Sequence, residues 1–110
     1  MRVYWLNDKL KAQLEDADFL VRKYDQVVAK KVAQRLREIG ESRHYGLIPS
    51  ASRKHAIKEG SNFLYFAVDV PGLREKRGKL RLLFRPHGEH DISRIETIVD
   101  VIIIGLKDYH

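Results

Sequence analysis

The spacing of hydrophobic residues changes character about halfway along the chain. Between Asp8 and Ile39 the sequence contains no Gly or Pro, and apolar residues recur at every third or fourth position, which is the period of an amphipathic helix. Asp25 is a residue type that caps helix starts, and a glycine such as Gly40 readily adopts the left-handed conformation that ends a helix. We therefore predict two helices, which meet around Tyr24 and Asp25, the second ending at Gly40.

Short runs of β-branched and aromatic residues indicate strands on both sides of this helical region. One run, Arg2 to Leu6, precedes the helices and contains Val, Tyr and Trp. Later runs are separated by breaks that contain Gly or Pro, the residues that favour turns. These later runs cover residues 55–58, 63–70, 79–85 and 97–104. The order predicts an α+β fold, in which a small antiparallel or mixed sheet carries two N-terminal helices on one face.

Length and composition limit the classes of protein that fit. A chain of 110 residues with 44% hydrophobic residues is expected to form one domain, spanning residues 1–110, with a core that needs no covalent support. The absence of cysteine excludes disulfide scaffolds, thiol nucleophiles and cysteine-ligated metals. The longest purely apolar run, Val101 to Ile104, is far shorter than the roughly 20 residues that span a bilayer. Because the first residues also lack the layout of a signal peptide, we expect a cytoplasmic protein.

The charge balance favours a polyanionic partner. The formal net charge is +6, which suits nucleic acid, a ribosome or an acidic protein. Between residues 73 and 85 there are six basic residues and a single acidic one, Glu75. In the predicted strand 79–85, alternation places Leu80, Leu82 and Phe84 on a core face and the basic side chains on the opposite face. The candidate nucleic-acid-binding residues are Arg74, Lys76, Arg77, Lys79 and Arg85 in this segment, and Lys30, Lys31 and Arg35 on the second predicted helix.

Arg81 is distinguished from these residues by its position. It lies in the middle of the strand between apolar neighbours, where a guanidinium reaches the floor of a groove and can bind a phosphate through two hydrogen bonds. His55 and Lys58 supply an imidazole and an ammonium near the start of the sheet. Ideal strand geometry points these two side chains to opposite faces, so their convergence would require a bulge or turn.

Two further clusters contain groups able to transfer protons or bind metals. Asp108, Tyr109 and His110 directly follow the most apolar strand. The segment from His87 to Asp91 contains possible metal ligands, but it lies in a turn and lacks a known metal-binding spacing. We expect an exposed loop there, with no metal and no cofactor.

Several short segments, taken in order, resemble toxins of the RelE/ParE superfamily, and within it the HigB-like branch, which includes chains labelled killer suppression proteins. The resemblance covers nearly the whole chain and is most specific at the terminal Asp-Tyr-His that follows a strand. The segments are Lys31 to Leu36, His55 to Lys58, Phe66 to Asp69, Arg81 to Phe84, and Ile102 to Ile104 leading into Asp108 to His110.

The resemblance implies a small sheet with two N-terminal helices and a ribosome-dependent endoribonuclease that needs no metal. Such toxins cleave mRNA in the ribosomal A site and are neutralised by a cognate antitoxin, expected here to be of the helix-turn-helix DNA-binding type. Matched motif to motif, the implied functional residues are His55, Lys58, Arg81, Asp108, Tyr109 and His110. Two alternatives remain at this point. One is a ParE-like toxin that inhibits a DNA topoisomerase without catalysis, and the other is a non-toxic regulator of the same fold.

Overall fold

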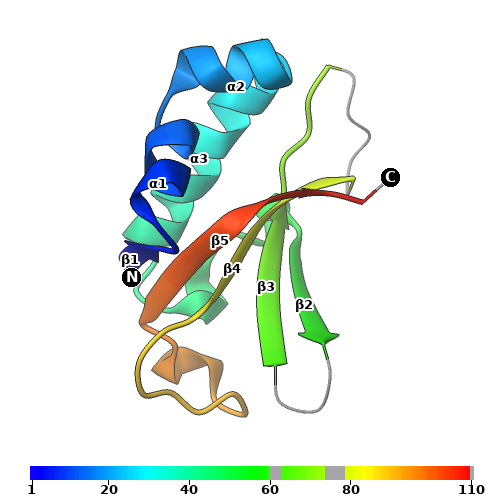
Figure 1. Cartoon of the computed structure of the whole chain (residues 1–110). Coiled ribbons are helices and arrows are strands. Elements are labelled where there is room, and N and C mark those ends of the chain that lie inside the picture. The colour runs from blue at the N-terminus through cyan, green and yellow to red at the C-terminus, as the bar shows by residue number, and fades with distance from the viewer. Residues whose placement is uncertain (60–62, 74–78, 110) are drawn as a thin grey trace.

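The computed structural model describes residues 1–59, 63–73 and 79–109. Within these residues the chain is α+β, as predicted, with helices on one side of a mixed sheet (Figure 1). The α-helices are α1 (Asp8–Leu14), α2 (Ala17–Lys23) and α3 (Gln26–Glu41). The strands are β1 (Arg2–Trp5), β2 (Lys54–Glu59), β3 (Phe63–Asp69), β4 (Leu80–Pro86) and β5 (Asp100–Asp108). Among these described residues, no helix has the length and apolar character needed to cross a membrane.

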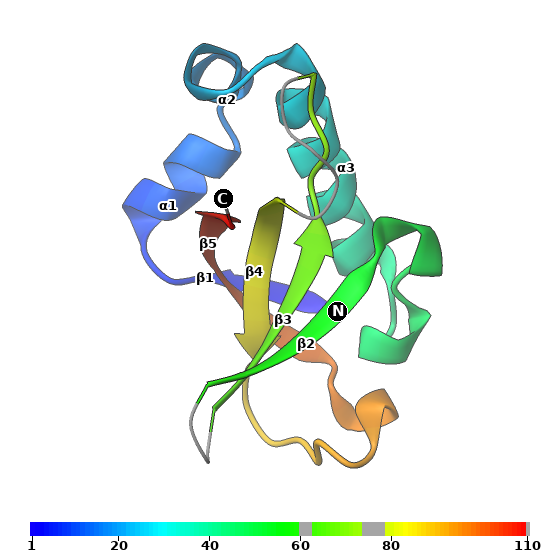
Figure 2. The same ribbon diagram turned by 90° about the vertical axis from the view of Figure 1, so that its right-hand side faces the viewer.

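The sheet has the strand order β1-β5-β4-β3-β2. Strand β1 pairs in parallel with β5, with Arg2 opposite Asp100, and every other neighbouring pair is antiparallel. Consequently β5 lies inside the sheet, between β1 and β4, although it is the latest strand in the sequence. Figure 2 shows the sheet after a quarter turn, with β2 and β3 in front of β4 and β5.

The hydrophobic core lies between the helices and one face of the sheet. Val28, Val32 and Ile39 of α3 are completely buried against the sheet. The alternation predicted for the fourth strand is confirmed, because Leu80, Leu82 and Phe84 are all fully buried. Among the described residues no α-helix covers the other face of the sheet, which carries Asp69 and Arg81, and we call it the open face.

The helical region differs from the prediction at two points. Asp25 caps α3 as predicted, since its Oδ1 accepts a hydrogen bond of 2.8 Å from the Val28 amide. However, the region before it forms two helices instead of one, because the Asp16 carboxylate caps the amide of Phe19 and starts a new helix. The predicted end at Gly40 is also wrong. Helix α3 continues through Glu41, and the extended Ser42 closes it by donating its hydroxyl to the Glu38 carbonyl.

The last predicted strand is displaced toward the C-terminus. It was expected at residues 97–104, but Ile95–Thr97 forms a 3-10 turn and β5 runs from Asp100 to Asp108. The pairing of β5 with β4 contains a bulge. Leu83 pairs with Gly105 whereas Phe84 pairs with Ile103, so Ile104 is an extra residue and the pairing continues beyond it.

Candidate functional site

The open face contains one fully buried carboxylate, that of Asp69 at the end of β3. The side chain of Asp69 is only 1% exposed, although its strand neighbours are apolar core residues on the opposite face. A buried carboxylate is stable only when it is paired, and three basic side chains lie close to it. His55 Nε2 lies 2.8 Å from Asp69 Oδ1, Arg53 Nε lies 3.2 Å from Oδ2, and Arg81 Nε lies 3.8 Å from Oδ1.

Each partner reaches Asp69 from a different segment. His55 is in β2, opposite Ala67 of β3, and is a quarter exposed. Arg81 is in β4 directly opposite Asp69. Arg53 precedes β2 in a left-handed conformation with φ of 57°, which is uncommon for a residue with a side chain. That conformation ends a 3-10 turn and starts the strand, and it brings a guanidinium from outside the sheet to the carboxylate.

The main chain of Asp69 is fixed from the opposite side by α3. Arg35 Nε donates a hydrogen bond of 2.8 Å to the Asp69 carbonyl, and Arg35 Nη1 lies 2.9 Å from Glu38 Oε1. Arg35 is 6% exposed, so this clamp is inside the protein. The interpretation of Arg35 as a nucleic-acid contact therefore does not fit its position: its guanidinium joins a helix to the end of β3.

Arg81 also connects Asp69 to the residues that follow β5. The guanidinium carbon of Arg81 lies 4.7 Å from the centre of the Tyr109 ring, and Lys107 Nζ lies 5.1 Å from the same ring. The Tyr109 amide donates to the carbonyl of Lys79, which extends the pairing of β4 and β5 by one residue. The contacts of Arg81 and Lys107 with the Tyr109 ring are favourable, because a cation is attracted to the electron-rich face of an aromatic ring.

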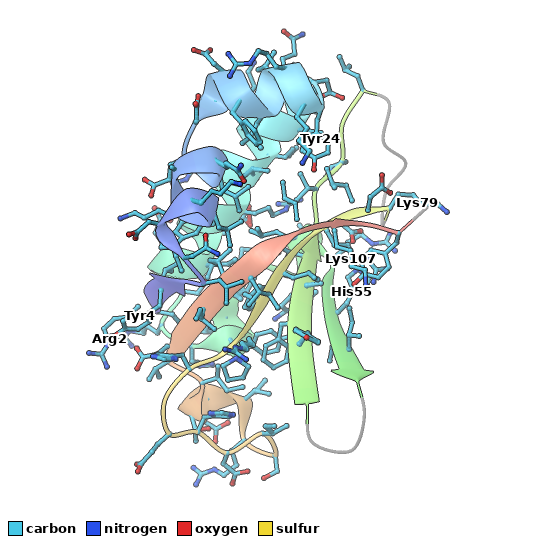
Figure 3. The ribbon with its side chains drawn as sticks, viewed as in Figure 1. Arg2, Tyr4, Tyr24, His55, Lys79 and Lys107 are labelled. Carbon is cyan, nitrogen blue, oxygen red and sulfur yellow. The ribbon has the colours of Figure 1, made fainter. Side chains whose placement is uncertain are left out.

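The bulge at Ile104 explains why Tyr109 lies on the open face. Ile103 is buried in the core, and strict alternation from it would send residues 105, 107 and 109 to the core side. The extra residue reverses this parity, so Leu106 pairs with the buried Leu82 and Lys107 pairs with Arg81. In Figure 3, Lys107 and His55 are both labelled toward the end of the sheet remote from Arg2 and Tyr4.

The described part of this site has an excess of positive charge. Arg53, Arg81 and Lys107 supply three basic side chains, and Asp69 supplies the carboxylate among them. Arg81 and His55 are both partly exposed, at 22% and 25% of their side chains. The open face therefore offers an imidazole for proton transfer, a guanidinium for a phosphate and a phenol ring for stacking, held around one buried carboxylate.

Not all of the predicted catalytic residues are brought together by the described structure. Lys58 is opposite Leu64, and the register of β2 with β3 runs without a shift, so the bulge required for His55 and Lys58 to converge is not present in this stretch. Asp108 is exposed and lies opposite Leu80, one position before Tyr109. His110 lies outside the described residues.

The predicted nucleic-acid-binding residues are dispersed. Arg74, Lys76 and Arg77 lie outside the described residues. Lys79 directly precedes β4 and Arg85 lies within it, and both are partly buried. On α3, Lys30 is exposed, and Lys31 donates to Gln34 Oε1 over 3.3 Å. These helix lysines belong to the layer on the other side of the sheet from His55, so the described structure does not join them to the open face (Figure 1).

Lys54 shows how closely spaced basic residues differ in environment. It neighbours His55 in β2 but occupies the opposite alternate position, and its Nζ donates to the carbonyls of Tyr45 and Gly46 over 3.4 and 3.3 Å. Burial lowers the pKa of Lys54, because desolvation disfavours its charged form. Lys54 is therefore a packing residue. Its sequence neighbours Arg53 and His55 are the basic residues of this segment that lie on the open face.

Sequence analysis missed Asp69 and Arg53 as members of the site. Asp69 interrupts the apolar run from Phe66 to Val70, and a carboxylate flanked by valines in a predicted strand was a signal that it needs a buried partner. No comparable signal existed for Arg53, because its guanidinium reaches Asp69 only through the left-handed conformation of its own backbone.

Comparisons with known proteins do not assign this site, since no family model, no curated protein and no solved structure matches the chain.

Proposed function

We propose that this protein is a ribosome-dependent endoribonuclease, the toxin of a toxin-antitoxin pair, which arrests translation by cleaving mRNA. One observation carries the proposal: on the open face of the sheet, His55 and Arg81 both contact Asp69, and the Tyr109 ring lies against Arg81. The resemblance to HigB-like toxins implies these same three residues. The net charge of +6 further supports a polyanionic substrate.

The proposed reaction is an internal transesterification of RNA. The 2′-oxygen attacks the adjacent phosphorus while a base takes the 2′-hydroxyl proton. The bond from phosphorus to the 5′-oxygen then breaks, and an acid protonates that oxygen. The products are a 2′,3′-cyclic phosphate and a 5′-hydroxyl end, so the reaction requires no metal or redox step.

The residues of the site fit the demands of this reaction. His55 is an imidazole, the side chain best suited to proton transfer near neutral pH. Arg81 lies near the start of β4, the middle strand of the sheet, where a guanidinium can neutralise charge that develops on the phosphoryl oxygens. Tyr109 presents an aromatic ring on which an RNA base can stack. Lys58, Asp108 and His110 complete the set that the resemblance implies.

The proposal includes a partner and a place of action. A basic toxin of this size would be neutralised by an antitoxin, expected to be of the helix-turn-helix DNA-binding type, whose acidic groups complement its charge. Action on ribosomes requires the cytoplasm. Co-expression with the product of the neighbouring gene, followed by co-purification at low salt, tests the partnership; a chain that elutes alone contradicts it.

The decisive experiment is induced expression in bacteria with transcript mapping. The wild-type chain should halt growth and produce mRNA fragments with 5′-hydroxyl ends, whereas a His55→Ala variant expressed to the same level should do neither. Purified protein should cleave mRNA bound to programmed ribosomes. Normal growth with intact transcripts would overturn the proposal, and growth arrest with intact transcripts but damaged DNA would favour the topoisomerase inhibitor.

A further inference from the structure

The carboxylate of Asp69 does more than neutralise charge, because its two oxygens are used differently. Oδ1 is 2.8 Å from His55 Nε2, a hydrogen-bond distance, whereas Arg81 Nε is a full ångström further away. Oδ2 accepts no hydrogen bond from the described residues, although Arg53 Nε is 3.2 Å from it. The shortest and best-formed contact of this buried carboxylate is therefore with the imidazole.

The position of Asp69 is fixed independently of that contact. The Asp69 carbonyl accepts a hydrogen bond from Arg35 of α3. The amide of the next residue, Val70, donates to the Leu80 carbonyl, and Asp69 itself pairs with Arg81 of β4. Because both the main chain and the carboxylate are buried, Asp69 presents Oδ1 to His55 as a rigid acceptor.

A carboxylate that accepts from one ring nitrogen determines the tautomer of a neutral imidazole. An ionised carboxylate only accepts, so Nε2 must carry the proton, and Nδ1 keeps its lone pair. Nδ1 of His55 has no hydrogen bond to the described residues, and the ring is a quarter exposed toward the open face. The nitrogen that remains available is thus the one that can accept a proton.

We propose that Asp69 is a positioning residue, which holds His55 as its Nε2–H tautomer so that Nδ1 takes the proton of the RNA 2′-hydroxyl. This inference rests on the proposed function and deepens it, because it assigns the base that the sequence left open. In the reaction, the 2′-oxygen–phosphorus bond forms as the proton moves to Nδ1. The 5′-oxygen leaves with a proton from a group other than His55.

The test combines a spectroscopic measurement with kinetics. Long-range ¹⁵N–¹H NMR at alkaline pH should show the wild-type His55 ring protonated at Nε2. In Asp69→Asn, the new side-chain amide can either donate a hydrogen bond to Nε2 of His55 or accept one from it. The His55 ring should therefore become a mixture of tautomers or switch to Nδ1–H. Cleavage of ribosome-bound mRNA should then fall by about 10²-fold or more in kcat, with KM changed by less than about threefold.

Asp100→Asn is the matched control. It also removes one carboxylate from an ion pair, with Arg2 at 2.7 Å, but it lies at the other end of β5. Its His55 tautomer and its cleavage rate should equal those of the wild type. A drop in cleavage equal to that of Asp69→Asn would mean that loss of any sheet carboxylate is harmful, and would overturn the positioning role.

The outcomes separate this inference from the proposed function. A wild type that cleaves mRNA but carries the His55 proton on Nδ1 overturns the inference and leaves the function intact. A wild type with Nε2–H that cleaves no RNA overturns the function, and with it the assignment of His55 as the base. If Asp69→Asn does not fold, the tautomer of the wild type alone decides, since Nδ1–H there contradicts the proposal.

Discussion

Replacing Arg81 with alanine distinguishes a structural from a catalytic role for this side chain. Its contacts with Asp69 and Tyr109 are weak: an ion pair of 3.8 Å and a ring contact of 4.7 Å, with the side chain 22% exposed. Each such contact is worth about 0.5–1 kcal/mol, so Arg81→Ala should lower the free energy of unfolding by about 1–2 kcal/mol. Asp69 keeps His55 and Arg53 as partners, which limits the loss.

The expected effect on activity is much larger than the effect on stability. Loss of one preorganised group that stabilises developing charge costs about 10²–10³ in rate. Thermal unfolding should show a drop in Tm of about 4–8 °C, and single-turnover cleavage of ribosome-bound mRNA should show the rate loss. Arg37→Ala removes the same charge from an exposed position on α3 and should change neither.

The reasoning would be refuted by the opposite pattern. If Arg81 were an essential partner of the buried carboxylate, its removal would cost about 3–5 kcal/mol, and toxicity would fall only in proportion to the unfolded protein. That result would remove Arg81 from the proposed site and leave the open face without its phosphate anchor.

Three further substitutions test the fold. Phe84→Ala removes a fully buried ring and should cost about 3–5 kcal/mol in urea unfolding, and a loss under about 1 kcal/mol would contradict the core assignment. Asp25→Ala removes the cap on the Val28 amide and should cost about 1 kcal/mol by the same assay, while unchanged stability would mean the cap is dispensable. The hydrogen bond from Arg2 lowers the pKa of Asp100, so the stability it gives is complete above about pH 4 and is lost as pH falls further. Asp100→Asn should therefore flatten the fall in unfolding free energy below about pH 4, and an unchanged slope would contradict the pairing.

The sequence predicted those features that depend on local pattern. Alternation in residues 79–85 identified the buried face of β4, and the capping chemistry of Asp25 located the start of α3. The split at Asp16 was missed because a short acidic break is compatible with a continuous helical period. The Gly40 end was wrong because a glycine permits a left-handed cap without requiring one, and Ser42 closes the helix instead.

The candidate site was less accessible to sequence reasoning because it depends on register and turns. His55, Arg81 and Tyr109 were identified by their chemistry, but Asp69, the buried residue that His55 and Arg81 share, lies in an apolar strand. The bulge at Ile104 has no sequence signal apart from the glycine beside it, yet it decides which face Tyr109 occupies. Such features arise from pairing between distant strands, which single-residue patterns do not encode.

The location of β5 inside the sheet also determines the order in which the strands can pair while the chain is being synthesised. Strand β1 has no partner until β5 has left the ribosome, since Arg2 pairs with Asp100, and Tyr109 reaches its place only when β5 is seated against β4. Antiparallel pairing of β2, β3 and β4 can precede this step, because those strands are consecutive in the chain. The open face is thus assembled late during translation. If the chain is a nuclease directed at translating ribosomes, this topology delays its activity until β5 has emerged and paired with β1 and β4.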